Sequence, residues 1–277
     1  MRFIDDDNKF LTTPITMREV RKETFSMKAL KAPGPDGVQP LFYQHFWNTI
    51  AMSLFQFCQK CFHENLFLAD LNNSYITLIP KTKNPENISQ FRPITLCNVS
   101  YKILAEIIVD RLRPILCRTI SPQQASFLPG RQASDNIFVT QEIIHTLMNL
   151  KGKSGGLILK IDLEKAYDMA DWDFLESVLK WFNVEKSFCN LIMSCVKNTT
   201  TSILWNGTPL TSFNPSRGLR QGDPLSPYLF VMCMEYLSAL ILDKVNQNKW
   251  KGIKASPNRP TITHLFFADD LILFTKK

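Results

Sequence analysis

The sequence lacks an apolar run that could comfortably cross a lipid bilayer. Its most apolar stretch, residues 225–242, contains Pro227 near its start and Glu235 in its middle, and it barely reaches membrane-spanning length. Acidic residues occupy positions 5–7, where a secretory signal would need its apolar core. The sequence therefore predicts a buried core helix over 225–242, no membrane partner and no secretion.

The sequence also lacks the even, regularly spaced cysteines of a disulfide framework. Its seven cysteines are odd in number and scattered, which is typical of free thiols in a reducing compartment. We therefore expect an intracellular protein, in nucleus or cytoplasm, without a disulfide partner. Cys58, Cys61 and His63 suggest zinc, but the second pair of ligands is missing, and cysteines three apart on an apolar helix are more often core.

The composition is that of a folded protein with a basic surface. The 277 residues are 45% apolar and 21% charged, which suffices for a sizeable core. The formal net charge is +7 and the pI about 9.0, and a basic balance favours a polyanionic partner through phosphate contacts. Many basic proteins bind no nucleic acid, so charge alone does not identify the partner.

Local patterns predict a mixture of helices and strands. Thr16 and Glu19 have the spacing of a capping box, with Val20, Met27 and Leu30 as one apolar stripe of the helix that follows. We expect buried helices over 42–62 and further helices over 100–117, which Pro114 should kink or end, and 136–150. Strands are expected over 75–79, which should open a basic hairpin, 157–159, 265–267 and 271–274, and turns over 33–37, 82–90 and 151–156.

Carboxylates stand at the ends of the predicted strands. Asp269 and Asp270 occupy the tip of a hairpin, and Asp162 ends the apolar strand 157–159. A lone aspartate pair is usually a solvated turn, but two strands that present acids at one sheet edge can hold two divalent cations about 3.5–4 Å apart. Mg²⁺ suits such a site, Mn²⁺ is also accepted, and the natural reaction class is phosphoryl transfer.

Three motifs in order resemble the catalytic motifs of reverse transcriptases. They are Asp162-Leu-Glu-Lys-Ala-Tyr-Asp168, Arg217-Gly-Leu-Arg-Gln-Gly-Asp-Pro-Leu-Ser-Pro227 and Phe267-Ala-Asp-Asp270. Upstream, three segments resemble the fingers motifs of the non-LTR (LINE-type) group: Leu78-Ile-Pro-Lys81, Phe91-Arg-Pro-Ile-Thr-Leu96, and Phe127-Leu-Pro-Gly-Arg131 with Asp135-Asn136. The amino-acid sequence Ala32-Pro-Gly-Pro-Asp-Gly37 is most similar to the corresponding segment of plant elements.

The resemblance implies an α+β fold of the right-hand polymerase type, with fingers and an incomplete palm containing an antiparallel sheet. Residues 1–70 would form an N-terminal helical extension and residues 71–277 the fingers and palm, truncated after the third motif with the thumb absent. The implied activity is RNA-directed DNA polymerase, with an RNA template, a DNA primer, deoxynucleoside triphosphates and Mg²⁺ (or Mn²⁺).

The resemblance also assigns roles to single residues. Asp162 and Asp269 would be the metal ligands, with Asp270 as a supporting catalytic neighbour. Tyr167 would exclude ribonucleotides by packing against the sugar. The remaining assignments are nucleotide contacts by Lys81, Arg92, Gln221 and Gly222, and a template contact by Arg131. Purely structural roles are the alternative for several of these residues. Asp162 would then cap a strand end, Tyr167 would belong to the core, Lys81 or Arg131 would be surface residues, and Asp168 would cap a helix.

Met169 and Ala170 stand where the family usually has a basic and an aliphatic residue. This departure would loosen packing under the site or mark a disabled copy, so a second reading is an inactive relic that at most binds RNA. A third is a group II intron maturase or a viral RNA-copying polymerase. The 217–227 and 267–270 segments favour the non-LTR group, and Tyr167 disfavours an enzyme that accepts ribonucleotides.

Overall fold

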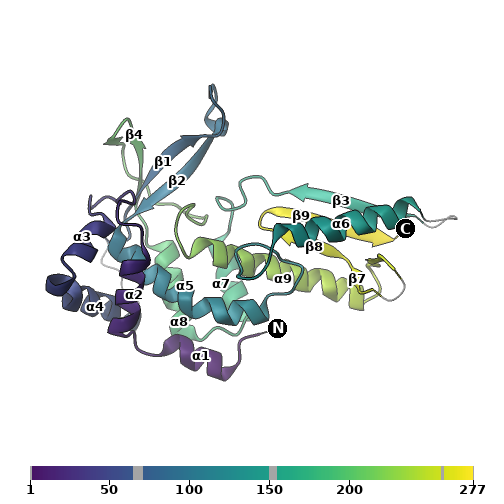
Figure 1. Ribbon diagram of the computed structural model, residues 1–277, viewed down its shortest axis with the longest axis horizontal. Helices are drawn as coiled ribbons and strands as arrows, with labels where there is room; N and C mark the ends of the chain where they lie inside the picture. The colour runs from purple at the N-terminus through teal and green to yellow at the C-terminus, as the bar shows by residue number, and fades with distance from the viewer. Residues whose placement is uncertain (1, 65–70, 150–154, 257–258, 277) are drawn as a thin grey trace. The chain divides into compact units, whose positions relative to one another are not determined.

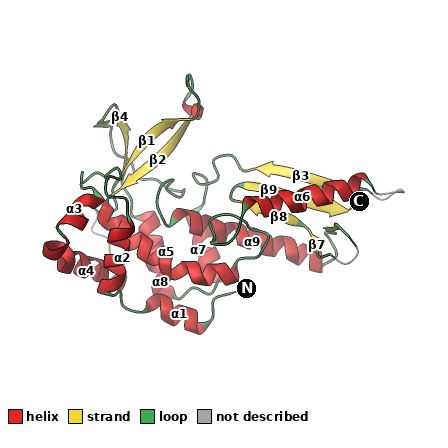
Figure 2. Ribbon diagram, viewed as in Figure 1, coloured by secondary structure: helices red, strands yellow, loops and turns green. Residues whose placement is uncertain are grey.

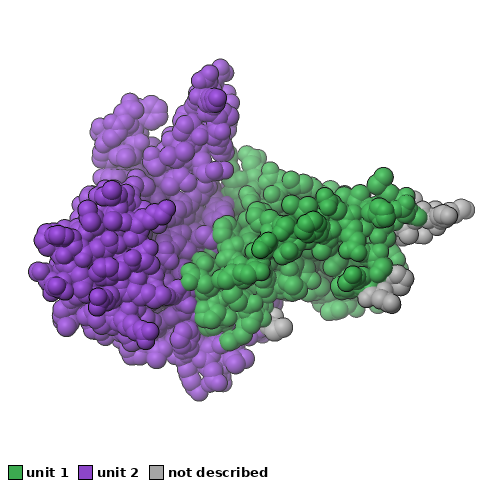
Figure 3. Space-filling model, in the orientation of Figure 1, with its two compact units in different colours: residues 1, 113–166, 228–277 green, residues 2–112, 167–227 purple. Residues whose placement is uncertain are grey.

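The computed structural model describes residues 2–64, 71–149, 155–256 and 259–276, which form two compact units (Figure 3). Unit 2 comprises residues 2–112 and 167–227, and unit 1 comprises residues 113–166 and 228–277. Both helices and strands are present, with helices in succession near the N-terminus and strands in succession near the C-terminus (Figure 2). The mixture of helices and strands expected from the sequence is confirmed.

Unit 2 combines helices with a four-stranded sheet of order β2-β1-β4-β5. Its strands are β1 (Ser74–Pro80), β2 (Phe91–Cys97), β4 (Thr201–Trp205) and β5 (Thr208–Pro209). Its helices are α1 (Asp5–Thr12), α2 (Met17–Ser26), α3 (Pro40–His45), α4 (Trp47–Glu64), α7 (Trp172–Trp181) and α8 (Lys186–Lys197), with a 3₁₀ turn at Ile88–Gln90. Helices α5 (Val99–Thr119) and α9 (Ser226–Asn246) have residues in both units.

The capping box predicted the start of α2 correctly. The Glu19 backbone N–H donates to the Thr16 hydroxyl at 3.3 Å, and the Thr16 N–H donates to the Glu19 carboxylate at 2.8 Å. Val20 is buried, but the helix ends at Ser26, and Leu30 lies beyond it with 74% of its surface exposed. The predicted apolar stripe is therefore wrong at its last member.

The predicted β1–β2 hairpin is confirmed. Its strands pair antiparallel from Ser74 opposite Cys97 to Pro80 opposite Phe91. Helices also form over the aromatic region 42–62, as α3 and α4, but Phe42 and Phe46 are exposed, so that region is less buried than predicted. Pro114 lies inside α5 and does not end it.

Unit 1 is built on an antiparallel sheet of order β3-β9-β8, with helix α6 (Ala133–Met148) lying along it (Figure 1). The strands are β3 (Gly156–Asp162), β8 (His264–Phe267) and β9 (Asp270–Lys276), and β6 (Ile253–Lys254) and β7 (Thr261–Ile262) form a small second sheet. Ile143 of α6 packs with Ile253, Leu265 and Phe274 in the core of this unit. The helix thus covers one face of the sheet.

The strand predicted over 157–159 exists but is not fully buried. Ile158 packs against the α6 core, whereas Leu157 and Leu159 are 58% and 46% exposed. Successive side chains point to opposite faces of a strand, so only alternate residues of β3 reach the core under α6. The turn predicted over 151–156 lies largely outside the described residues.

The apolar segment 225–242 is confirmed as a helix, α9, with Leu229, Val231 and Met232 fully buried. Across residues 2–64, 71–149, 155–256 and 259–276, no helix combines the length and apolarity that a membrane crossing requires.

His264 of β8 joins the sheet to α9 through a buried polar contact. Its side chain is fully buried, with Nε2 2.8 Å from the Ser238 hydroxyl and Nδ1 2.9 Å from the Thr263 hydroxyl. Burial lowers the pKa of His264 from its ordinary 6.5 to about 4. The imidazole is therefore neutral in the folded protein at neutral pH.

This burial predicts acid sensitivity. Between pH 6.5 and about 4 the unfolded chain binds the proton more readily than the folded protein, so the histidine's contribution is complete above pH 6.5 and is lost on acidification. From about pH 7 to about pH 5 the free energy of unfolding should fall by roughly 2 kcal/mol more in the parent than in His264→Gln. Urea unfolding at both pH values measures this difference, and equal losses in the two proteins would refute it.

Candidate active site

The first aspartate of the first motif and the two aspartates of the third motif lie at one edge of the unit 1 sheet. Asp162, the last residue of β3, pairs directly with Asp270, the first residue of β9. Asp269 lies in the preceding turn, where its carbonyl accepts a hydrogen bond from the Leu163 N–H at 3.3 Å. Because directly opposed residues project from the same face of an antiparallel pair, the Asp162 and Asp270 side chains lie on one face of the sheet; metal binding by Asp162 and Asp269 stays a prediction.

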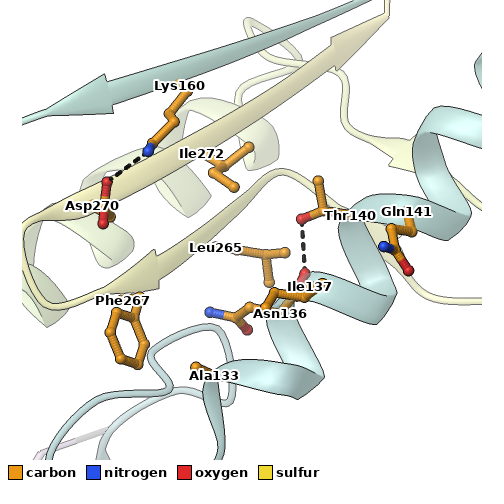
Figure 4. Close-up of a pocket in the computed structure, with 10 residues that line it drawn as sticks. All are labelled: Ala133, Asn136, Ile137, Thr140, Gln141, Lys160, Leu265, Phe267, Asp270 and Ile272. Atoms are coloured by element: carbon orange, nitrogen blue, oxygen red, sulfur yellow. Dashed lines mark hydrogen bonds and ion pairs between the residues drawn. The ribbon is translucent and has the colours of Figure 1, made fainter.

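The three carboxylates differ in their partners. Lys160 lies diagonally across from Asp270, and its ammonium is 3.2 Å from that carboxylate (Figure 4). Within the part of the chain that the structure describes, neither the Asp162 nor the Asp269 carboxylate takes part in a hydrogen bond or an ion pair. Asp162 is exposed and Asp269 half-buried. These two carboxylates are therefore available to a ligand, and Asp270 is partly neutralised.

This donor set fits a hard divalent cation. Carboxylate oxygens at an accessible edge suit Mg²⁺, which is usually held by one or two carboxylates together with substrate phosphates. No group of three or more histidine, cysteine, aspartate or glutamate side chains gathers as a metal cluster within the described ranges. A cation at Asp162 and Asp269 would thus take its remaining ligands from substrate and water.

A pocket of about 450 Å³ lies beside the carboxylates, between α6 and the sheet (Figure 4). Lys160, Asp270 and Phe267 line it from the sheet, and Asn136 and Ile137 line it from α6. The pocket therefore lies on the face of the sheet from which Asp270, and Asp162 opposite it, project.

In unit 2, the end of the first motif and the residues just after it pack against the second motif. The Leu219 N–H donates to the Tyr167 carbonyl at 2.7 Å, and the Gly218 N–H donates to the Ala170 carbonyl at 2.8 Å. The Gln221 side-chain amide donates to the Asp168 carboxylate at 3.4 Å. Asp168 does not cap α7, because Asp171 is the N-cap residue and accepts from the Phe174 N–H.

Gly222 lies where only glycine fits. Its φ is +106°, and a Cβ at this position would lie 2.9 Å from the Thr95 carbonyl oxygen. The Thr95 N–H donates to the neighbouring Gln221 carbonyl at 2.6 Å. The glycine therefore allows a close backbone approach to β2, and the approach to a nucleotide that was predicted for it stays a prediction.

A buried ionic network beneath Gln221 and Gly222 was missed by sequence reasoning. Arg220 lies 2.6 Å from the Asp223 carboxylate, which also accepts from the Tyr101 hydroxyl at 2.6 Å. The guanidinium lies over the Tyr101 ring, 4.4 Å from its centroid, and donates to the Asn72 side chain at 2.7 Å. Burial raises the pKa of Tyr101, so its hydroxyl keeps the proton that it donates. The only available signal was the arginine and aspartate three residues apart.

Lys81 and Arg92 lie at the same end of the β1–β2 hairpin. The Lys81 ammonium donates to the Ser89 carbonyl at 3.1 Å, and its N–H donates to the Gln90 carbonyl at 2.8 Å. Arg92 lies opposite Ile79, and its side chain is exposed. Their nucleotide contacts stay predictions, as does the role of Tyr167, whose side chain is half-buried.

Arg131 has a clear structural role. Its guanidinium donates at 2.7 Å to each of the Ile120 and Gln124 carbonyls, at 3.3 Å to the Cys117 carbonyl, and to the Ser121 carbonyl. These four bonds use four of the five donors of an arginine. Arg131 therefore caps the end of α5, and its template contact stays a prediction.

Two further sequence features belong to unit 2. Met169 is 56% exposed, so the departure at this position leaves no hole in a core. Cys58 and Cys61 are buried on α4, where burial raises the pKa of both thiols, that of Cys61 to about 12. Both are protonated at neutral pH.

Comparison with known proteins identifies the family. The profile "Reverse transcriptase (RNA-dependent DNA polymerase)" matches residues 79–277, a range that contains all the predicted site residues. The chain belongs to the reverse transcriptase family.

Relatives of this reverse transcriptase domain include proteins of non-LTR elements. It is 29% identical to the Xenopus laevis "Transposon TX1 uncharacterized 149 kDa protein", over 95% of the chain and 20% of that protein. It is 27% identical to the Drosophila melanogaster "Retrovirus-related Pol polyprotein from type-2 retrotransposable element R2DM", over 95% of the chain and 23% of that protein. The chain thus spans about a fifth of the length of these relatives.

An Arabidopsis thaliana protein, "Uncharacterized mitochondrial protein AtMg01250", is 57% identical over 65 residues, which are 24% of this chain and 53% of that protein.

Proposed function

We propose that this chain catalyses RNA-directed DNA synthesis as the polymerase part of a LINE-type retroelement. The observation that carries the proposal is the pairing of Asp162 with Asp270 at the sheet edge, beside Asp269, in a member of the reverse transcriptase family. The R2 and TX1 relatives support the LINE-type assignment. The Arabidopsis relative and the amino-acid sequence of residues 32–37 support a plant-type element.

In this proposal Asp162 and Asp269 hold Mg²⁺ or Mn²⁺, and Asp270 supports them while paired with Lys160. The bound cation would neutralise phosphate charge and activate the attacking hydroxyl. The primer 3′-oxygen forms a bond to the α-phosphorus, the bond from that phosphorus to the bridging oxygen breaks, and pyrophosphate leaves. The hydroxyl proton passes to solvent.

The remaining predicted residues bind and select the substrates. Lys81 and Arg92 neutralise the triphosphate, as cationic clamps do in phosphoryl transfer. Gln221 and Gly222 line the nucleotide and template pocket, and Tyr167 packs against the sugar where a 2′-hydroxyl would clash. Arg131 supports the site from the end of α5 and contacts template phosphate only with its fifth donor.

Primer extension tests the proposal. The purified chain, supplied with Mg²⁺, a DNA primer on an RNA template and one nucleotide at a time, should add the complementary deoxynucleotide and discriminate strongly against the matching ribonucleotide. A parent protein that extends no primer, or that adds ribonucleotides equally well, would refute the proposed activity or the role of Tyr167, respectively.

A further inference from the structure

A buried segment of unit 1, residues 123–126, lies against the strand that leads to Asp269. The Phe266 N–H donates to the Gln123 carbonyl at 2.8 Å, and the Ala125 N–H donates to the Phe266 carbonyl at 3.0 Å. The two segments run parallel at this point. We call residues 123–126 the brace, because they extend β8 on the side away from β9.

Within the brace, the Gln124 side chain reaches the turn of the carboxylate hairpin. Its Oε1 accepts from the Ser126 N–H at 3.0 Å and from the Ala268 N–H at 3.4 Å. Ala268 immediately precedes Asp269 and has a φ of +53°. This left-handed conformation costs a residue with a Cβ about 1–2 kcal/mol, so the turn needs support from its surroundings.

The brace and the β8 residue that it pairs with are both anchored. The Asn136 side-chain amide donates to the Phe266 carbonyl at 2.9 Å, and Arg131 donates to the Gln124 carbonyl at 2.7 Å. Gln124 is fully buried. A fixed backbone therefore presents its side-chain oxygen to the turn.

Gln124 also carries a cost that its packing does not explain. Its Nε2 is buried without a hydrogen-bond partner among the described residues, which costs about 1–3 kcal/mol. An apolar side chain of similar size would avoid that cost but would lose the oxygen. The side chain thus lowers the stability of the core through its unpaired Nε2 and supports the turn through its Oε1. This combination points to a functional constraint on the residue.

We propose that Gln124 is a positioning residue that holds the Ala268–Asp269 turn in the geometry required for divalent cation binding. Ligands must be held to within about 0.5 Å of their productive positions, and partners behind the ligands typically change metal affinity 10–100-fold. Gln124 does not touch the cation and acts through the backbone of Asp269. This inference rests on the proposed polymerase site.

The test measures Mn²⁺ binding by electron paramagnetic resonance of the free ion, with primer extension in parallel. Gln124→Met keeps the side-chain length and removes the acceptor oxygen, and it should weaken Mn²⁺ binding about tenfold. Gln247→Met, an exposed glutamine in the same unit, should bind as the parent does. Asp269→Asn defines complete loss at this site.

The two proposals fail in different ways. If the parent binds Mn²⁺ through Asp269 but extends no primer, the polymerase function is contradicted. The role of Gln124 still stands in that case, provided that Gln124→Met weakens Mn²⁺ binding. If Gln124→Met folds and binds Mn²⁺ within about twofold of the parent, the proposed role of Gln124 is overturned. Should that variant not fold, amide exchange of Ala268 in the parent decides: slow exchange is expected, and exchange at the rate of an unstructured peptide would overturn the inference.

Discussion

Asp162→Asn is expected to lower the rate of primer extension by about 1,000-fold. A metal clamp contributes several kcal/mol to the stabilisation of the transition state, and each 1.4 kcal/mol corresponds to a factor of ten in rate. Asparagine keeps the size of the side chain but removes the charge that a cation requires. Single-turnover extension of a primed RNA template measures the loss, and Asp269→Asn should lose as much.

Asp270→Asn is the matched control, because Asp270 stands at the same sheet edge but is paired with Lys160. Its loss should be about tenfold or less, since its role is to support rather than to hold the cation. A profile in which Asp270→Asn is as damaging as Asp162→Asn, while Asp269→Asn is mild, would contradict the assignment of the ligands.

Arg220→Met should lower the free energy of unfolding by about 3–5 kcal/mol, the usual cost of removing one partner of a buried ion pair. The Asp223 side chain is only 3% exposed, so its charge would remain in the interior with the Tyr101 hydroxyl and the Leu225 N–H as donors. Urea unfolding followed by tryptophan fluorescence measures the change.

The double variant Arg220→Met, Asp223→Leu separates the cost of an orphaned charge from the value of the network. Replacing both partners by apolar residues removes the uncompensated carboxylate, so much of the lost stability should return. The buried geometry implies that the network supports the Gln221–Gly222 loop. A loss of less than about 1 kcal/mol in the free energy of unfolding of Arg220→Met would contradict that support.

Local sequence rules predicted the elements whose signals are themselves local. The Thr16–Glu19 pair marked the start of α2 because the capping bonds form between residues three apart. Two apolar runs around Asp269 and Asp270 gave the β8–β9 hairpin, and an apolar strand ending in Asp162 gave its partner. The convergence of the acids follows from this pairing.

Where prediction failed, tertiary contacts decided. Leu157 and Leu159 looked like core, but only the alternate face of β3 lies under α6. Four carbonyls at the end of α5 and in the loop that follows accept hydrogen bonds from Arg131; this structural role was not predicted, and its template contact stays a prediction. A sequence cannot show which backbone carbonyls a distant arginine will meet.

The supports of the site were the least predictable part. Gln124 and Ala268 are 144 residues apart in the chain, and Tyr101 and Asp223 are 122 residues apart. Their roles depend on single hydrogen bonds between distant segments, which neither periodicity nor motif spacing reveals. The positions of the carboxylates were proposed from strand ends together with the motif resemblance; the residues that support them gave no such signal.

The proposal that Asp162 and Asp269 hold the catalytic cation is tested most directly by locating Mn²⁺ through its anomalous scattering. The crystals would contain the chain, a primed RNA template and an incoming deoxynucleotide. The predicted result is an anomalous peak shared by the Asp162 and Asp269 carboxylates, with Lys160 still paired to Asp270. No peak at this sheet edge, or a cation held by Asp270 without Asp269, would contradict it.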